Sequence, residues 1–135
     1  MADFTVTAAN VVPSTAARDT LLAGEAITAG MAIYKKTSDG KAYKAQSDGT
    51  AEEATVIGIA INDAAAGQVV AYQKSGSLTF GSIFGGAGKV VCASNTAGAI
   101  APSADVTTGR RLSIIGYTTS ATAMTIDINN TGTTA

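Results

Sequence analysis

The chain has 135 residues, of which 46% are hydrophobic and only 14% are charged, and its net charge is −1. This length suits one domain with a substantial core, and the hydrophobic content argues against a disordered chain. The composition also argues against nucleic-acid binding, because no basic patch could displace counterions from phosphates, and against a membrane span, because no apolar run approaches ~20 residues.

Residues 1–23 are predicted to form an N-terminal arm. Residues 4–7 alternate apolar and polar side chains as a strand does, residues 11–14 are extended because they lead into a proline, and residues 15–22 have helical character. A poorly ordered terminus is one interpretation. The arm is apolar for a solvated tail, however, so we expect it to dock on the body of the protein or on a neighbour.

Residues 24–80 are predicted to hold a first β unit. The pair Asp39-Gly40 supplies the positive φ of a hairpin turn between two strands, and Gly58 indicates a bulge or a close backbone approach. The strands of this unit are expected at 32–36, 41–44, 55–61 and 68–73.

Residues 81–135 are predicted to repeat this plan as a second unit, so that residues 24–135 form one β domain. Residues of similar type recur at a constant offset between the units, as in the pairs Ile33 and Val91, Gly40 and Gly98, and Gly58 and Gly116. The strands of the second unit are expected at 90–93, 99–101, 112–118 and 124–129, and residues 131–135 are expected to fray.

Short strands about every ten residues, with turn residues between them, predict an all-β fold. A small barrel and a sandwich both fit this spacing. The sequence favours neither one closed barrel nor two packed sheets.

The sequence offers few groups for chemistry. The chain has no His, which removes the commonest general base and metal ligand, and its single Cys92 excludes an internal disulfide and lies in a predicted strand, as a core residue does. Three acidic residues, Glu52, Glu53 and Asp63, lie in polar loops and lack the spacing of a calcium loop. We expect no enzyme activity, no metal and no cofactor.

Three further segments have more than one interpretation. The glycine-rich segment 81–88 lacks the ending of a phosphate-binding loop and is interpreted as the connector of the two units, with Phe84 as a core plug or a partner anchor. The basic doublets at 35–36 and 110–111 fit solvated strand ends or ion pairs with an acidic partner.

Several sequence blocks occur in a recognisable order. They are DFTVTAANVVP at 3–13, AGEAITAG at 23–30, DGKAY at 39–43, VIGIA at 56–60, AAAGQ at 64–68, TAGAIAP at 96–102, Gly109 and IGY at 115–117. This order resembles the tailed-bacteriophage capsid cement (decoration) proteins over nearly the whole chain.

The resemblance implies a small β-barrel or β-tulip-like body that forms a homotrimer. It also implies that the protein is made in the host cytoplasm and binds the outer surface of an assembled head, where it bridges major capsid protein subunits and stabilises the shell. The residues expected to contact the capsid or a neighbouring protomer are Phe4, Val6, Val11, Val12, Pro13 and Phe84.

Two other functions are open at this stage. One is a virion-surface adhesion or carbohydrate-binding module, which exposed aromatic side chains on a β scaffold would favour. The other is a subunit of a fibre or spike base.

Overall fold

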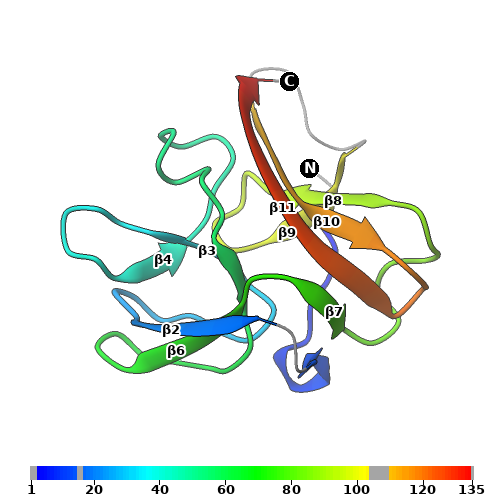
Figure 1. Cartoon of the computed structure of the whole chain (residues 1–135), viewed down its shortest axis with the longest axis horizontal. Helices are drawn as coiled ribbons and strands as arrows, with labels where there is room; N and C mark the ends of the chain where they lie inside the picture. Colours follow the sequence, from blue (N-terminus) through cyan, green and yellow to red (C-terminus); the bar gives the residue numbers. More distant parts are fainter. Residues whose placement is uncertain (1–2, 15–16, 104–109, 135) are drawn as a thin grey trace.

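The computed structural model describes residues 3–14, 17–103 and 110–134 and shows an all-β protein built from two antiparallel sheets (Figure 1). Sheet A has six strands in the order β1 (Val12–Pro13), β7 (Gly76–Thr79), β11 (Ala123–Thr134), β10 (Arg111–Thr118), β8 (Val90–Ala93) and β9 (Ile100–Pro102). Sheet B has five strands in the order β2 (Arg18–Leu22), β6 (Val69–Gln73), β5 (Gly58–Ala60), β3 (Ala32–Lys35) and β4 (Ala42–Lys44). The two sheets are not closed into one barrel, so the fold is sandwich-like.

The described part of the chain has no α-helix, and its 3-10 turn η1 spans Ala8–Asn10. Among the described residues no helix is long and apolar enough to cross a membrane. The sequence suggested helical character at residues 15–22, but residues 18–22 form strand β2, and residues 15–16 lie outside the described part of the chain. A short helix is costly to nucleate, whereas pairing with β6 satisfies the backbone groups of every second residue of the strand.

The internal repeat is visible in the pairing of the strands. If β2, β6, β5, β3 and β4 are matched in turn with β7, β11, β10, β8 and β9, the two sheets have the same strand order. The register agrees as well, because Ile33 pairs with Lys44 in sheet B while Val91 pairs with Pro102 in sheet A. The step along the chain from Ile33 to Val91 equals the step from Lys44 to Pro102, so the prediction of two similar β units is confirmed.

The units divide at different residues from those expected. Strand β7 belongs to sheet A, which places the division between β6 and β7, at residues 74–75 instead of 80–81. Strand β2 belongs to sheet B, although the sequence placed residues 18–22 in the arm. Strand β11 also continues to Thr134, with Arg111 paired to Thr134, so residues 131–134 extend the sheet.

A central core lies between the sheets. Its fully or nearly buried residues are Ala32, Tyr34, Ala45, Val56, Ile59, Leu78, Phe80, Phe84, Val91, Ala93, Ile100, Ile115, Met124 and Ile126. A lateral core covers the other face of sheet B and contains Ala23, Ile27, Ile33, Ala42, Ala60, Ala64, Val70 and Tyr72. Sheet B is therefore packed on both faces.

The two sheets do not pack on each other through equivalent faces. Ile33 of sheet B lies in the lateral core, but its counterpart Val91 lies in the central core. Conversely, Ile59 of sheet B lies in the central core, whereas its counterpart Tyr117 is 44% exposed. Sheet B packs on sheet A through one of its faces, and the equivalent face of sheet A is its outer face.

Backbone hydrogen bonds join the two sheets at one side. Gly98 accepts from the N–H of Ala32 at 3.0 Å and donates to the carbonyl of Ala45 at 2.8 Å. Gly98 has φ +79°, and its counterpart Gly40, in the β3–β4 hairpin, has φ +70°. The two predicted turn glycines therefore have the same conformation in both units.

Candidate interaction surfaces

The N-terminal arm lies on the body of its own chain. The N–H of Phe4 donates to the carbonyl of Ile100 at 2.9 Å, and the hydroxyl of Ser94 donates to the Asp3 carboxylate. The equivalent carbonyl in sheet B is that of Ala42. It accepts from the N–H of Gly24, which lies in the connection after β2. The arm therefore completes the second unit in the way that an internal segment completes the first.

The aromatic residues of the arm and the connector belong to the central core. The Phe84 ring is 1% exposed and lies between Phe4 and Phe80, with ring centroids 5.0 Å and 5.3 Å apart and edge-to-face geometry. Of the two interpretations of Phe84, the structure supports the core plug. The expectation that Phe84 contacts a partner is corrected, because a buried ring offers no surface.

Val6 and Val11 also pack against the central core, over Gly30. A Cβ atom on Gly30 would lie 2.4 Å from Val6 Cγ1, and Gly30 has φ +91°. The missing side chain of Gly30 therefore leaves room for the arm, which the sequence did not indicate. A groove of about 220 Å³ remains between Phe4, Val6 and the turns at 28–31 and 96–99.

Val12 and Pro13 form β1 at the edge of sheet A, opposite Thr79 and Leu78. Pro13 is half-buried, but Val12 is 58% exposed. Of the six predicted contact residues, Val12 is the one whose side chain is mostly free in the described structure. Deleting residues 1–13 would remove part of the core, so it cannot test a contact by itself.

The outer face of sheet A forms a larger candidate surface. Val90 and Tyr117 are cross-strand partners and are 37% and 44% exposed. With Ile114, Asp127 and Asn129 they line a hollow of about 470 Å³. An aromatic ring beside an aliphatic pair and a carboxylate can bind an apolar surface with a polar rim, or the face of a sugar ring.

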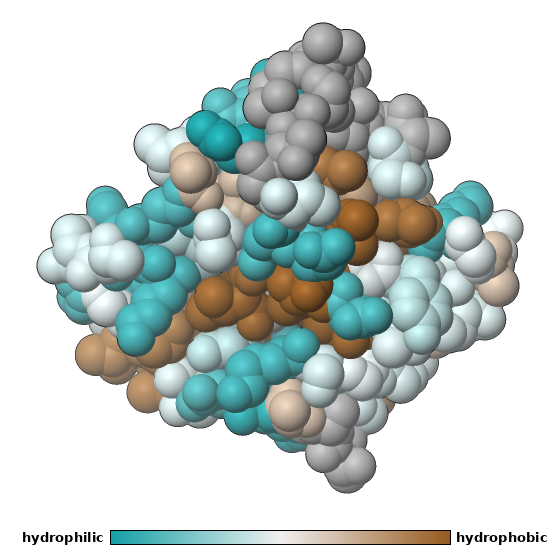
Figure 2. Space-filling model, turned by 45° about the horizontal axis from the view of Figure 1, so that its top comes forward, coloured by the Kyte–Doolittle hydropathy of each residue, from teal (hydrophilic) through white to brown (hydrophobic). Residues whose placement is uncertain are grey.

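A second apolar pair lies on sheet B. Leu22 of β2 and Val69 of β6 are cross-strand partners and are 48% and 54% exposed. Space-filling Figure 2 shows hydrophobic side chains reaching the surface in a band across one face, with hydrophilic side chains on both sides. Contiguous apolar surface of this kind is typical of interaction sites, whereas single exposed apolar residues are not.

Sequence reasoning missed these exposed pairs because each lies within a regular strand pattern. The internal repeat matches Val90 and Tyr117 with Ala32 and Ile59, which are buried in the core. Only the stacking of the sheets shows that Val90 and Tyr117 are left uncovered.

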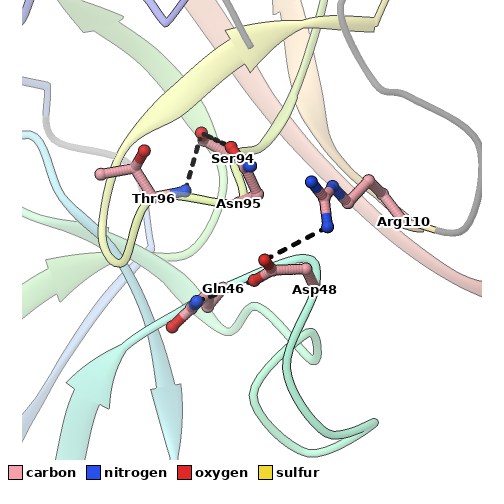
Figure 3. A network of polar contacts seen from close by, with 6 residues as sticks. All are labelled: Gln46, Asp48, Ser94, Asn95, Thr96 and Arg110. Atoms are coloured by element: carbon pink, nitrogen blue, oxygen red, sulfur yellow. Dashed lines mark hydrogen bonds and ion pairs between the residues drawn. The ribbon is translucent and has the colours of Figure 1, made fainter.

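A polar seam joins the two sheets near Asp48 and Arg110 (Figure 3). Arg110 Nη1 lies 3.3 Å from Asp48 Oδ2, and the Gln46 side-chain amide donates to Asp48 Oδ1 at 2.7 Å. The neighbouring Ser94 hydroxyl accepts from the N–H of Thr96 at 3.0 Å. Arg110 thus finds its acidic partner within the chain, and a pair this exposed contributes about 0–1 kcal/mol.

The other basic doublet lies at the end of β3. Lys35 is exposed, and Lys36 Nζ lies 4.9 Å from the centre of the Tyr43 ring. The Tyr43 hydroxyl donates to Asp39 at 2.6 Å, and this bond lowers the pKa of Asp39 and raises the pKa of Tyr43. These contacts fix the hairpin and leave Lys35 for solvent or a partner.

The acidic residues singled out in the sequence bind backbone or hydroxyl donors. Asp63 accepts from the N–H of Ala29 at 2.9 Å, and Glu52 accepts from the Thr37 hydroxyl at 2.7 Å. No cluster of three His, Cys, Asp or Glu that could hold a metal occurs among the described residues. Burial raises the pKa of the Cys92 thiol to about 11, so the thiol is protonated at neutral pH.

The sequence was compared with family models and with curated proteins. No family model matches the chain, and no curated protein matches it.

Proposed function

We propose that this protein is a capsid decoration (cement) protein of a tailed phage. In this proposal it binds the outer surface of an assembled head, bridges major capsid protein subunits and acts as a homotrimer. The order of sequence blocks supports the family, and one structural observation supports a binding role. Val90 and Tyr117 stay exposed although their counterparts Ala32 and Ile59 are covered by a packed sheet.

A cementing role follows from mass action. A protein that binds the assembled shell and not its free subunits stabilises the shell by RT ln(1 + [L]/Kd), about 2.7 kcal/mol per site at a hundredfold excess over Kd. Three linked contacts gain avidity of ~10²–10⁴ over one contact. Each of the three contacts therefore needs no more surface than one face of sheet A.

The test is co-sedimentation with phage heads that lack this protein, followed by heating. Saturable binding that raises the rupture temperature of the heads would support the proposal. A Val90→Ser, Tyr117→Ser double variant should lose binding, while Ser77→Ala, an exposed position on the same sheet, serves as the matched control. No binding by the folded wild-type protein would refute the proposal.

Tyr117 gives the adhesion alternative a specific basis. Its exposed ring lies beside Asp127 and Asn129 in one hollow, and an aromatic platform with polar neighbours is suited to sugars. A glycan array separates the two functions. If the protein is an adhesion module, the wild-type protein binds glycans and leaves heads unaltered, and Tyr117→Ser abolishes glycan binding.

A further inference from the structure

Sheet B has one strand fewer than sheet A, and the missing strand is at a defined place. In the matched order, β7 of sheet A corresponds to β2 of sheet B. The outer edge of β7 is covered by β1, but β2 is the last strand of its sheet. Among the residues that the structure describes, none takes the position equivalent to β1 in sheet B.

The two edges match residue by residue. Thr79 of β7 is opposite Ala123 of β11, and Thr20 of β2 is opposite Ala71 of β6. The N–H of Phe80 bonds the Thr122 carbonyl just before β11, so by alternation the backbone groups of Thr79 point to the outer edge. There Thr79 faces Val12 of β1, and its hydroxyl donates to the Val12 carbonyl at 3.3 Å.

The backbone of β2 has the same alternation. The carbonyl of Ala17 accepts from Lys74 and the N–H of Ala23 donates to Gln68, so odd-numbered residues bond β6 and even-numbered residues point outward. Arg18, Thr20 and Leu22 are all exposed. At the Leu22 end of this edge, Ala23 bridges Ala42 of β4, and the N–H of Gly24 donates to the Ala42 carbonyl. At Arg18 and Thr20, no described residue pairs with the outward backbone groups except the Asp19 carboxylate, which accepts from the N–H of Thr20 at 2.8 Å. The Asp19 side chain is 56% exposed and its carboxylate also pairs with Lys74 Nζ at 3.7 Å, so giving up the bond to Thr20 costs little.

We propose that this edge of β2 accepts an extended segment of the major capsid protein as a sixth, antiparallel strand. The inference rests on the proposed function for the identity of the partner. An added strand gains affinity from main-chain hydrogen bonds and selectivity from adjacent side-chain sites. The exposed Leu22–Val69 pair beside this edge provides such a site for an apolar side chain.

A second copy of this chain is a poorer occupant. Its own β1 is engaged on its own β7. Two β2 strands paired antiparallel about Thr20 would bring two Asp19 carboxylates, each directed at a Thr20 N–H, to the same pair of hydrogen bonds. Like charges at such a distance oppose pairing.

The first test uses two substitutions at one residue. Thr20→Pro removes an outward N–H and leaves the bonds to β6 in place, whereas Thr20→Val keeps the N–H in a side chain of the same shape. On heads lacking the protein, we expect the proline variant to bind at least tenfold more weakly than wild type and the valine variant to bind as wild type does. Equal binding by the folded proline variant would overturn the inference and leave the proposed function standing.

The second test needs no variant, so it stands if Thr20→Pro does not fold. Amide hydrogen exchange at residues 18–22 of the wild-type protein is measured free and on heads, with residues 69–73 of β6 as the internal reference. The expected result is that the Arg18 and Thr20 amides become protected on heads. Binding without this protection would overturn the inference, as would protection in the free protein that grows with concentration, which would identify a second copy. Failure of the wild-type protein to bind heads would refute the proposed function and the partner named here.

Discussion

Replacing Phe84 by Ala tests whether this ring is a core plug or a surface left for a partner. The ring is 1% exposed and makes edge-to-face contacts with Phe4 and Phe80. Truncating a buried Phe costs about 3–5 kcal/mol, because the removed atoms lose their burial and the site collapses only in part. With an unfolding entropy of about 2.1 cal/mol/K per residue over 135 residues, a loss of about 4 kcal/mol lowers Tm by roughly 14 °C.

Differential scanning calorimetry and urea unfolding measure this loss. Phe84→Leu is the matched control and should cost about 1–1.5 kcal/mol, while Val12→Ala, at an exposed position, should stay within about 0.5 kcal/mol of wild type. A double-mutant cycle of Phe4→Ala with Phe84→Ala should give a coupling of about 0.5–1.5 kcal/mol. A Phe84→Ala protein that melts within about 3 °C of wild type would refute the placement of this ring in the core.

Three further predictions follow from local geometry. Gly30→Ala should destabilise the protein by about 1–3 kcal/mol more than Gly67→Ala in chemical unfolding, because both glycines have positive φ but only Gly30 has the arm against the site of its Cβ; equal losses would contradict the packing of the arm. Burial raises the pKa of the Cys92 thiol in the folded protein from 9.0 to about 11, so the contribution of the protonated thiol to folding stability is fully present below pH 9. Stability should then fall by about 1.4 kcal/mol per pH unit from pH 9 to 11. Unfolding curves measured against pH should show that Cys92→Ala lacks this slope. Asp48→Asn should cost no more than about 1 kcal/mol, and 1 M salt should remove the difference, because its ion pair with Arg110 is partly exposed; a larger or salt-independent loss would show that the seam between the sheets depends on this pair.

Local patterns in the sequence predicted several parts of the fold correctly. The pair Asp39-Gly40 predicted the β3–β4 hairpin, and Gly58 predicted a close backbone approach, since a Cβ there would lie 2.6 Å from the carbonyl oxygen of Gln73. The internal repeat predicted the second unit, and its predicted strand at 90–93 is β8. Each strand and turn depends on residues near one another along the chain, so the sequence contains the physical cause.

The arm shows where local reasoning stops. Its apolar residues indicated docking, but whether a segment docks on its own chain or on a neighbour depends on the distant surface it meets. Gly30 and Phe84 make that surface here, so the arm packs on its own chain. Residues 18–22 are another case, because a weak helical pattern gives way to pairing with β6, a strand far away along the chain.

The candidate surfaces depend on tertiary structure even more. By itself the sequence determined an all-β, duplicated protein, because turn glycines and alternating apolar residues act within one strand or hairpin. It could not distinguish Tyr117, which is exposed, from its buried counterpart Ile59. Only the stacking of sheet A on sheet B decided that difference, and only the course of the arm decided that the edge of β7 is covered while no described strand covers the edge of β2 at Thr20. Both outcomes follow from long-range packing, since two equivalent faces or edges can be covered or exposed with the same local sequence pattern.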